Sequence, residues 1–190
     1  MQFSPLFEQA LVYATQAHCN QTRKQSGISY IAHILGVTAI AMEYGGNETE
    51  AIGALLHDTV EDCGGADRLK DIKARFGEKV AKIVEGCTDS DETPKPPWLE
   101  RKKNYLEHLP KSDASTRLVS ASDKLHNVRA IVADLRRHGP EVFERFKGKK
   151  DGTLWYYRSL VTAFRKFHDH RDLVDELDRV VTEMEKLAGA

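Results

Sequence analysis

The sequence predicts an all-α domain, a bundle of about ten helices. Apolar residues recur at intervals of three and four along most of the chain, as they do on the buried face of a helix. These runs begin after Ser, Asn or Asp and end at Gly or Pro, residues that commonly start and stop helices. No stretch alternates apolar and polar residues as a half-buried strand would. The 190 residues are expected to form one domain, since a chain of this length buries a sizeable core without disulfides.

The first half of the chain contains five predicted helices. Ser4 and Pro5 supply a cap and a first-turn proline for the first helix, and Asn47 can cap the third. The predicted helices span residues 5–18, 31–44, 48–62, 66–76 and 78–87. In the second of them, the residues spaced for burial are Ile31, Leu35, Thr38, Ala39 and Met42.

The second half begins with an acidic, proline-rich segment, residues 88–97, which is expected to be a loop that closes over a site or only connects two helices. Asp113 or Ser115 is expected to cap a long helix that ends at Gly139-Pro140. Residues 147–152 are expected to form a basic turn, and the aromatic residues at 155–157 to pack in the core. The remaining predicted helices span residues 98–108, 141–146, 153–168 and 173–187.

Composition excludes several classes of protein. The formal net charge of −1 argues against a general nucleic-acid binder, which would normally carry a basic excess. Cys19, Cys63 and Cys87 are odd in number and lack a CxxC spacing, so we expect reduced thiols in a cytoplasmic protein. No apolar run approaches the length of a membrane span, and the N-terminal residues show no basic region followed by an apolar core, so we expect neither a membrane span nor a signal sequence.

The segment 55–62, Leu-Leu-His-Asp-Thr-Val-Glu-Asp, has the strongest chemical signal. In a continuous helix, His57 lies one turn before Glu61, and Asp58 one turn before Asp62. Three carboxylates beside an imidazole on the continuation of a buried face are costly unless a cation or a hydrogen-bond network compensates them. The segment is therefore either part of a metal site or a solvated turn at a helix end, since glycines follow it.

Further candidate ligands lie elsewhere in the chain. His33 is near the start of the second predicted helix, and Asp123 lies midway along the long one, beside its apolar stripe. His126 and Asn127 follow Asp123 on the same strip. Two imidazole nitrogens and two carboxylate oxygens, from His33, His57, Asp58 and Asp123, would suit a divalent metal such as manganese. Sequence alone does not bring the four together.

In order and spacing, these motifs resemble the HD-domain phosphohydrolase superfamily, and within it the alarmone hydrolases related to the hydrolase half of the RelA/SpoT proteins. The resemblance covers about residues 5 to 135. It rests on Arg23-Lys24-x-Ser26-Gly27, His33, His57-Asp58-x-x-Glu61-Asp62, Phe76-Gly77, Val84-x-Gly86-x-Thr88, Arg101-Lys102 and Asp123-Lys124-Leu125-His126-Asn127. The chain departs from the longer relatives at Ile34 and Lys124, where they usually have proline and arginine.

The resemblance implies a compact HD-domain helical bundle and a role for each matching residue. It assigns a divalent metal, usually Mn²⁺, to His33, His57, Asp58 and Asp123, and it assigns water activation or leaving-group orientation to Glu61 and Asp62. It also implies that Arg23, Lys24, Ser26 and Asn127 contact the nucleotide. The implied reaction removes the 3′-pyrophosphate from (p)ppGpp-type alarmones, giving GDP or GTP and pyrophosphate.

Two other interpretations stay open at this stage. One is an HD-family 5′-nucleotidase acting on deoxynucleoside monophosphates, and the other is a module that binds an alarmone without turning it over. A panel of substrates separates these possibilities. The sequence leaves open the preferred base, the oligomeric state and the native metal.

Overall fold

The structure is a computed structural model that describes residues 3–23, 27–89 and 94–189. The regular elements in these ranges are helical, and a single isolated β-bridge joins Thr22 to Ser29. The α-helices are α1 (Pro5–Ala17), α2 (Ile31–Glu43), α3 (Glu48–Leu56), α4 (Thr59–Cys63), α5 (Gly65–Phe76), α6 (Glu78–Cys87), α7 (Trp98–His108), α8 (Ala114–His138), α9 (Lys149–Phe164) and α10 (Arg171–Leu187). Two 3₁₀ segments span Leu109–Lys111 and Gly139–Arg145. The predicted all-α class is confirmed.

Most predicted helix boundaries agree with the structure to within a few residues, and three expectations were wrong. The predicted helix 48–62 is two helices, α3 and α4, separated at His57 and Asp58. The segment expected as a helix at 141–146 is a 3₁₀ turn. Residues 147–152 were expected to form a basic turn, but residues 149–152 form the first turn of α9. A Cβ on Gly152 would lie 3.1 Å from the Trp98 ring of α7. The close packing of Gly152 against Trp98 favours a helix in a segment whose local sequence favours a turn.

The buried face of α2 also differs from the prediction. Leu35, expected in the core, is 46% exposed, whereas Ile34 and Val37 are fully buried. The helix contains almost no polar residues, so its sequence has no polar stripe to mark the solvent side. Contacts with both α3 and α8 decide which side is buried, and these contacts are invisible in the local pattern.

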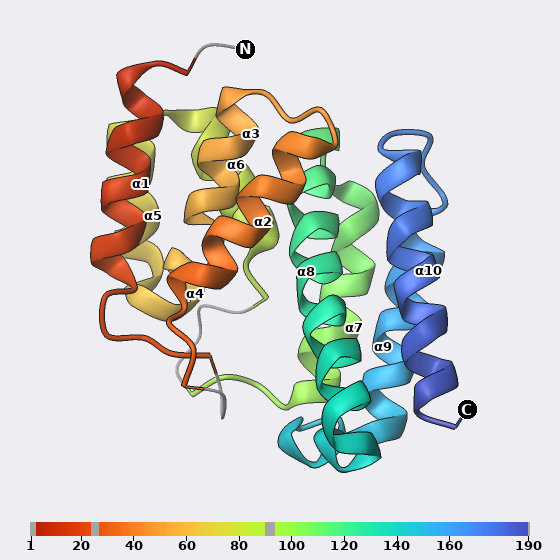
Figure 1. The fold of residues 1–190 in the computed structure, drawn as a ribbon. Helices are drawn as coiled ribbons and strands as arrows, with labels where there is room; N and C mark the ends of the chain where they lie inside the picture. The colour runs from red at the N-terminus through yellow and green to blue at the C-terminus, as the bar shows by residue number, and fades with distance from the viewer. Residues whose placement is uncertain (1–2, 24–26, 90–93, 190) are drawn as a thin grey trace.

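The molecule has two hydrophobic clusters that meet along α2. In Figure 1, α2 lies between α1 and α8. One cluster gathers residues of α1, α3, α4 and α5, and includes Ile34 of α2. The other surrounds the long helix α8, and includes Val37 and Ile40 of α2 together with residues of α9 and α10. Helices α2 and α8 carry His33 and Asp123, and α3 ends directly before His57; these three helices pack against one another where the two clusters meet. Ligands far apart in sequence can therefore converge inside a rigid region.

Helix α3 begins with a complete capping box. The Asn47 side chain accepts hydrogen bonds from the backbone N–H groups of Thr49 and Glu50, and Glu50 accepts one from the N–H of Asn47 at 2.8 Å. The other carboxylate oxygen of Glu50 accepts a hydrogen bond from Ser115 of α8. The cap therefore fixes the start of α3 and its position against α8.

Replacing Asn47 with alanine is expected to lower the free energy of unfolding by about 1 kcal/mol, because the first N–H groups of α3 lose their acceptor. Urea unfolding measures the change. Asn47→Asp, which keeps an acceptor at the cap, serves as the control and should unfold near the wild-type midpoint. Equal destabilisation by both variants would show that the cap is not the source of the effect.

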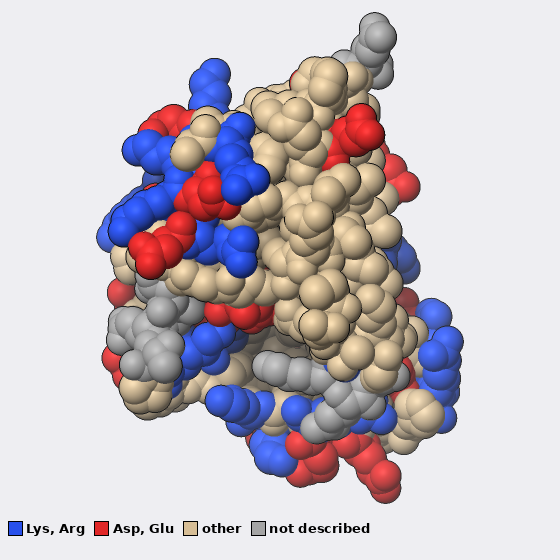
Figure 2. Space-filling model, turned by 90° about the vertical axis from the view of Figure 1, so that its left-hand side faces the viewer, with Lys and Arg blue, Asp and Glu red and all other residues tan. Residues whose placement is uncertain are grey.

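The face formed by α1 and α5 carries charges of both signs on one side only (Figure 2). Helix α5 pairs Lys70 with Asp67 and Arg75 with Asp71, whereas α1 carries Glu8 as its single charged residue. Opposite charges in neighbouring positions largely cancel, so this face presents no one-signed field. Among the described residues, no helix is both long and apolar enough to cross a bilayer.

Candidate metal centre

The break between α3 and α4 places His57 and Asp58 side by side. Neighbouring residues of a continuous helix point about 100° apart, so they seldom reach the same point. Here α3 ends at Leu56, Asp58 has φ −99° and ψ −3° between the two helices, and α4 begins at Thr59. The Nε2 atom of His57 consequently lies 3.0 Å from Oδ2 of Asp58. The expected continuous helix is corrected to a turn that aims both side chains inward.

His33 of α2 and Asp123 of α8 complete a four-residue cluster. The Nε2 atom of His33 lies 3.4 Å from Oδ2 of Asp58 and 3.3 Å from Oδ1 of Asp123. The Nε2 atom of His57 lies 3.8 Å from the same Asp123 oxygen. Ligand atoms of His33, His57 and Asp58 all lie within 4.8 Å of one another. Nitrogen and oxygen ligands bind a first-row divalent ion at about 2.0–2.2 Å, so this spacing leaves room for one ion between them.

The donor chemistry of the cluster fits a metal ion. The Nδ1 atom of His57 lies 2.8 Å from the carbonyl oxygen of Ala54, so Nδ1–H donates and Nε2 is the ring nitrogen left to bind a metal. This Nε2 is buried and has no hydrogen-bond partner among the described residues. Burying an imidazole nitrogen that has no hydrogen-bond partner costs free energy, unless a cation binds to that nitrogen. Tyr30 donates to Asp58 at 2.6 Å, and Lys124 donates to Asp123 at 2.6 Å.

Electrostatics keep both carboxylates of the cluster ionised. Burial by itself raises the pKa of Asp58, but His57 and His33 outweigh it and hold the pKa well below its usual range. Burial likewise opposes ionisation of Asp123, and the Lys124 ammonium dominates in lowering its pKa. Burial lowers the pKa of His57, but the Asp58 and Asp123 carboxylates raise it well above its ordinary value. Two ionised carboxylates facing two imidazoles supply the oxygen and nitrogen ligands that suit a divalent cation.

Glu61 and Asp62 lie at the edge of this cluster and not within it. Glu61 accepts hydrogen bonds from Lys95 at 2.7 Å and from the backbone N–H of Asp89 at 3.3 Å. Asp62 is exposed and accepts a hydrogen bond at 2.7 Å from Gln21, in the loop after α1. Both carboxylates lie on α4, the helix that begins directly after Asp58. This position suits proton transfer near a bound metal, and it separates the two carboxylates from the four candidate ligands.

The expected nucleotide contacts are described in part. Arg23 reaches across to α8, where its Nη2 donates to Oδ1 of Asn127 at 2.7 Å and its Nη1 lies 3.2 Å from Nδ1 of His126. Lys24 and Ser26 lie outside the described residues. The structure thus brings Arg23 and Asn127 together beside the metal cluster.

Three residues that support the cluster were given no role from the sequence: Tyr30, Lys124 and His126, although the last two belong to the motif that begins at Asp123. The first two donate to the candidate ligands, and His126 lies 2.9 Å from Nδ1 of His33. His126 had a signal, because it lies one helical turn after Asp123 on the same strip of α8. Tyr30 had none, since only the fold shows that it faces Asp58.

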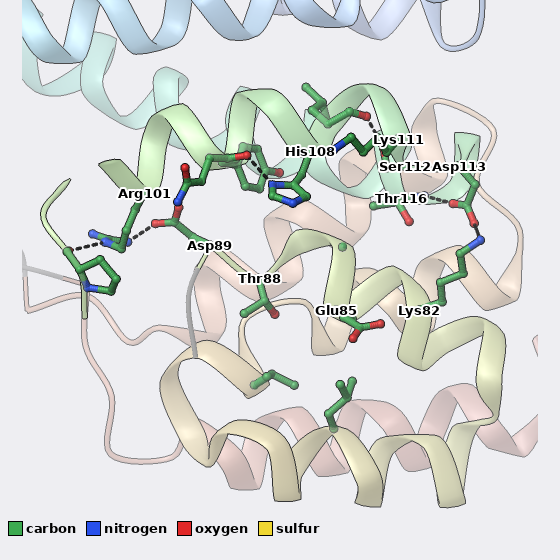
Figure 3. A pocket seen from close by; sticks show the side chains of 17 residues that line it. Lys82, Glu85, Thr88, Asp89, Arg101, His108, Lys111, Ser112, Asp113 and Thr116 are labelled. Atoms are coloured by element: carbon green, nitrogen blue, oxygen red, sulfur yellow. Dashed lines mark hydrogen bonds and ion pairs between the residues drawn. The ribbon is translucent and has the colours of Figure 1, made fainter. Parts of the chain in front are cut away.

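A cavity of about 530 Å³ lies between α6 and α7 (Figure 3). Its described lining includes none of the four clustered residues. Arg101 pairs with Asp89 at one end, and Lys82 pairs with Asp113 at 2.9 Å at the other. These pairs neutralise much of the charge in the cavity, so its chemistry differs from that of the metal cluster.

The sequence pattern that defines the HD domain matches residues 10–154 of the chain. The chain belongs to the HD domain family. Two curated HD relatives named guanosine-3′,5′-bis(diphosphate) 3′-pyrophosphohydrolase MESH1 come from Xenopus tropicalis and Homo sapiens. The frog protein is 40% identical over 139 residues, 72% of this chain and 73% of its own length. The human protein is 38% identical over 136 residues, 70% of this chain and 71% of its own length.

Longer relatives match a similar share of the chain. A guanosine-3′,5′-bis(diphosphate) 3′-pyrophosphohydrolase of Aquifex aeolicus is 36% identical over 65% of this chain but only 17% of its own length. Among solved structures, one described as a metazoan ortholog of SpoT that hydrolyzes ppGpp superposes with a TM-score of 0.79 at 27% identity, over 96% of this chain and 97% of that one. A Listeria monocytogenes protein gives a TM-score of 0.69 at 26% identity, over 83% and 99%. The HD fold predicted from sequence is therefore confirmed.

Proposed function

We propose that this HD domain hydrolyses the 3′-pyrophosphate of ppGpp-type nucleotides with the help of one divalent metal, Mn²⁺. The convergence of His33, His57, Asp58 and Asp123 at one buried point carries the proposal. Relatives that cover about 70% of the chain, and are matched over a similar share of their own length, are named for this reaction. These four residues would hold the metal.

The proposed reaction joins a water oxygen to the phosphorus next to the 3′-oxygen and breaks the bond between that phosphorus and the 3′-oxygen. When bound, the metal polarises the phosphoryl oxygens and makes the attacking water more acidic. Glu61 or Asp62 takes the proton that the water loses, and the departing 3′-oxygen gains a proton. The products are GDP and pyrophosphate from ppGpp, or GTP and pyrophosphate from pppGpp.

Residues beside the cluster would hold the nucleotide. Arg23 presents a planar guanidinium, which can stack on a base or bind phosphate oxygens, and Asn127 lies next to it. Lys24 and Ser26, which follow Arg23 in the same loop, are proposed to contact the substrate as well. We place this chemistry in the cytoplasm, where free nucleotides and reduced cysteines coexist.

Metal-stripped protein incubated with ppGpp, pppGpp, ppApp and deoxynucleoside monophosphates tests the proposal. Pyrophosphate released from ppGpp or ppApp only when Mn²⁺ is added would support it, and anion-exchange chromatography resolves the products. Inorganic phosphate released from the monophosphates alone would identify a 5′-nucleotidase instead. Absence of turnover in protein that binds metal would identify a nucleotide-binding module.

Metal binding is expected to strengthen as pH rises. In the metal-free protein, Asp58 and Asp123 outweigh burial and raise the pKa of His57 well above its ordinary value. Below that raised pKa, His57 carries a proton that the metal must displace, so affinity should increase about tenfold per pH unit. Calorimetry in buffers of different ionisation enthalpy measures the protons released. An affinity independent of pH, with no proton released, would contradict this expectation.

A further inference from the structure

His126 lies directly behind His33. Its Nδ1 is 2.9 Å from Nδ1 of His33 and 3.2 Å from Nη1 of Arg23. The His126 ring contacts the outer nitrogen of His33, and not the Nε2 atom that faces Asp58 and Asp123. Its contacts instead run from the outer nitrogen of one ligand to the loop after α1.

The two contacts together define how the imidazoles are protonated. A guanidinium can only donate hydrogen bonds, so Nδ1 of His126 must accept from Arg23. Since this nitrogen carries no hydrogen, the proton between the two rings belongs to Nδ1 of His33. Nε2 of His33, which faces Asp58 and Asp123, is then the atom that keeps its lone pair. This is the tautomer that a metal ligand needs.

The same guanidinium also supports the ligand on α8. Nη2 of Arg23 donates to Oδ1 of Asn127 at 2.7 Å, and Nδ2 of Asn127 donates to Oδ1 of Asp123 at 2.5 Å. Through His126 and Asn127, the fork of Arg23 is therefore connected to two candidate ligands from two helices.

The backbone of α2 is shaped to admit the His126 ring. Gly36 lies one turn after His33, and a Cβ at this position would fall 2.3 Å from both Cδ2 and Nε2 of His126. Real Cβ atoms do not approach other atoms so closely, so any side chain at position 36 would push the ring away. Because Gly36 has no side chain, α2 leaves the space that the His126 ring of α8 occupies.

We propose that His126 is a positioning residue that fixes the tautomer and orientation of His33 for metal binding and links the metal centre to the Arg23 loop. The inference rests on the proposed metal centre. Outer hydrogen-bond partners of metal-bound imidazoles hold the ring in place and raise its basicity, and their loss typically weakens metal binding by 10- to 100-fold. Arg23, expected to touch the nucleotide, would thus influence the metal site before any nucleotide binds.

Calorimetric titration of metal-stripped protein with Mn²⁺, without nucleotide, tests this role. His126→Phe keeps the ring volume but removes the acceptor, so Mn²⁺ affinity should fall by about 10- to 100-fold. His126→Asn places an amide oxygen near the former Nδ1 and should recover most of that loss. Wild-type affinity in a folded His126→Phe variant would overturn the proposal.

Substitution of Gly36 on α2 tests the same contact between α2 and the His126 ring. Gly36→Ala should displace the His126 ring and weaken Mn²⁺ binding as much as His126→Phe does, with no further loss in the double variant. Gly86→Ala is the matched control, because its Cβ would meet Thr116 at 2.5 Å and no residue of the metal cluster. Equal Mn²⁺ affinities for the two alanine variants would contradict the proposal.

Nitrogen-detected NMR of the wild-type histidine rings needs no substitution. The proposal predicts a hydrogen on Nε2 of His126 and none on Nδ1, and a hydrogen on Nδ1 would overturn it. Failure of the underlying metal centre is distinguishable, because wild-type protein would then bind no Mn²⁺ at all. Wild-type binding combined with unchanged binding in the variants would refute only the role of His126.

Discussion

Replacing His57 with alanine is expected to abolish both metal binding and hydrolysis. The substitution removes the one buried nitrogen of the cluster that has no hydrogen-bond partner among the described residues, and it leaves the Asp58 and Asp123 carboxylates without their neighbour. Losing a direct ligand should weaken Mn²⁺ binding by more than the roughly 10- to 100-fold typical of outer partners. Calorimetry measures the affinity, and pyrophosphate release from ppGpp measures activity.

Two further variants make this result specific. Asp123→Asn keeps the volume of the side chain while removing its negative charge, so its loss of metal would not reflect a cavity at the site. His108→Ala removes an exposed histidine whose ring, within the part of the chain that the structure describes, bonds only to the carbonyl of Asn104, and it should bind metal as the wild type does. A folded His57→Ala protein that binds Mn²⁺ with unchanged affinity would exclude the proposed ligand set.

Replacing Glu61 with glutamine is expected to leave Mn²⁺ binding nearly unchanged but lower kcat by about 10²- to 10⁴-fold, the usual contribution of a general acid or base. Asp62→Asn should behave in the same way if Asp62 is the group that takes the proton. Glu61 is held by Lys95 and Asp62 by Gln21, at the edge of the four-residue cluster, which is why the metal should stay bound. Comparing the two variants identifies the proton acceptor.

Glu85→Gln is the matched control for these substitutions, because Glu85 is an exposed glutamate of α6 on the cavity wall. Its turnover should equal that of the wild type. Metal loss from correctly folded Glu61→Gln protein would show that Glu61 is a ligand and would contradict the separation of roles.

Local patterns were sufficient for most of the fold. Caps such as Ser4, Asn47 and Asp113 lie where the sequence predicted them, because a cap acts on the few residues that follow it. The break at Asp58 could not be predicted in this way. Apolar periodicity continues through it, and only tertiary contacts of α3 and α4 show that the chain turns there. Leu35 was misplaced for the same reason, since α2 is apolar on nearly every side.

The candidate site was likewise predictable from the sequence only in part. His33, His57, Asp58 and Asp123 were selected from sequence because ionisable side chains beside apolar stripes need compensation, and the structure brings the four together. The partners that orient them were not predictable from local sequence. Tyr30 reaches Asp58 across a loop, and Arg23 reaches α8 over more than a hundred residues of chain. Such contacts depend on the packing of whole helices.

The most direct test of the account is a titration of metal-stripped protein with Mn²⁺ while pyrophosphate release from ppGpp is followed. One metal centre built from His33, His57, Asp58 and Asp123 predicts that activity rises in proportion to added metal and becomes constant at one ion per chain. Turnover in the absence of metal, or activity that continues to rise well beyond one equivalent, would contradict a single metal centre as the source of the reaction.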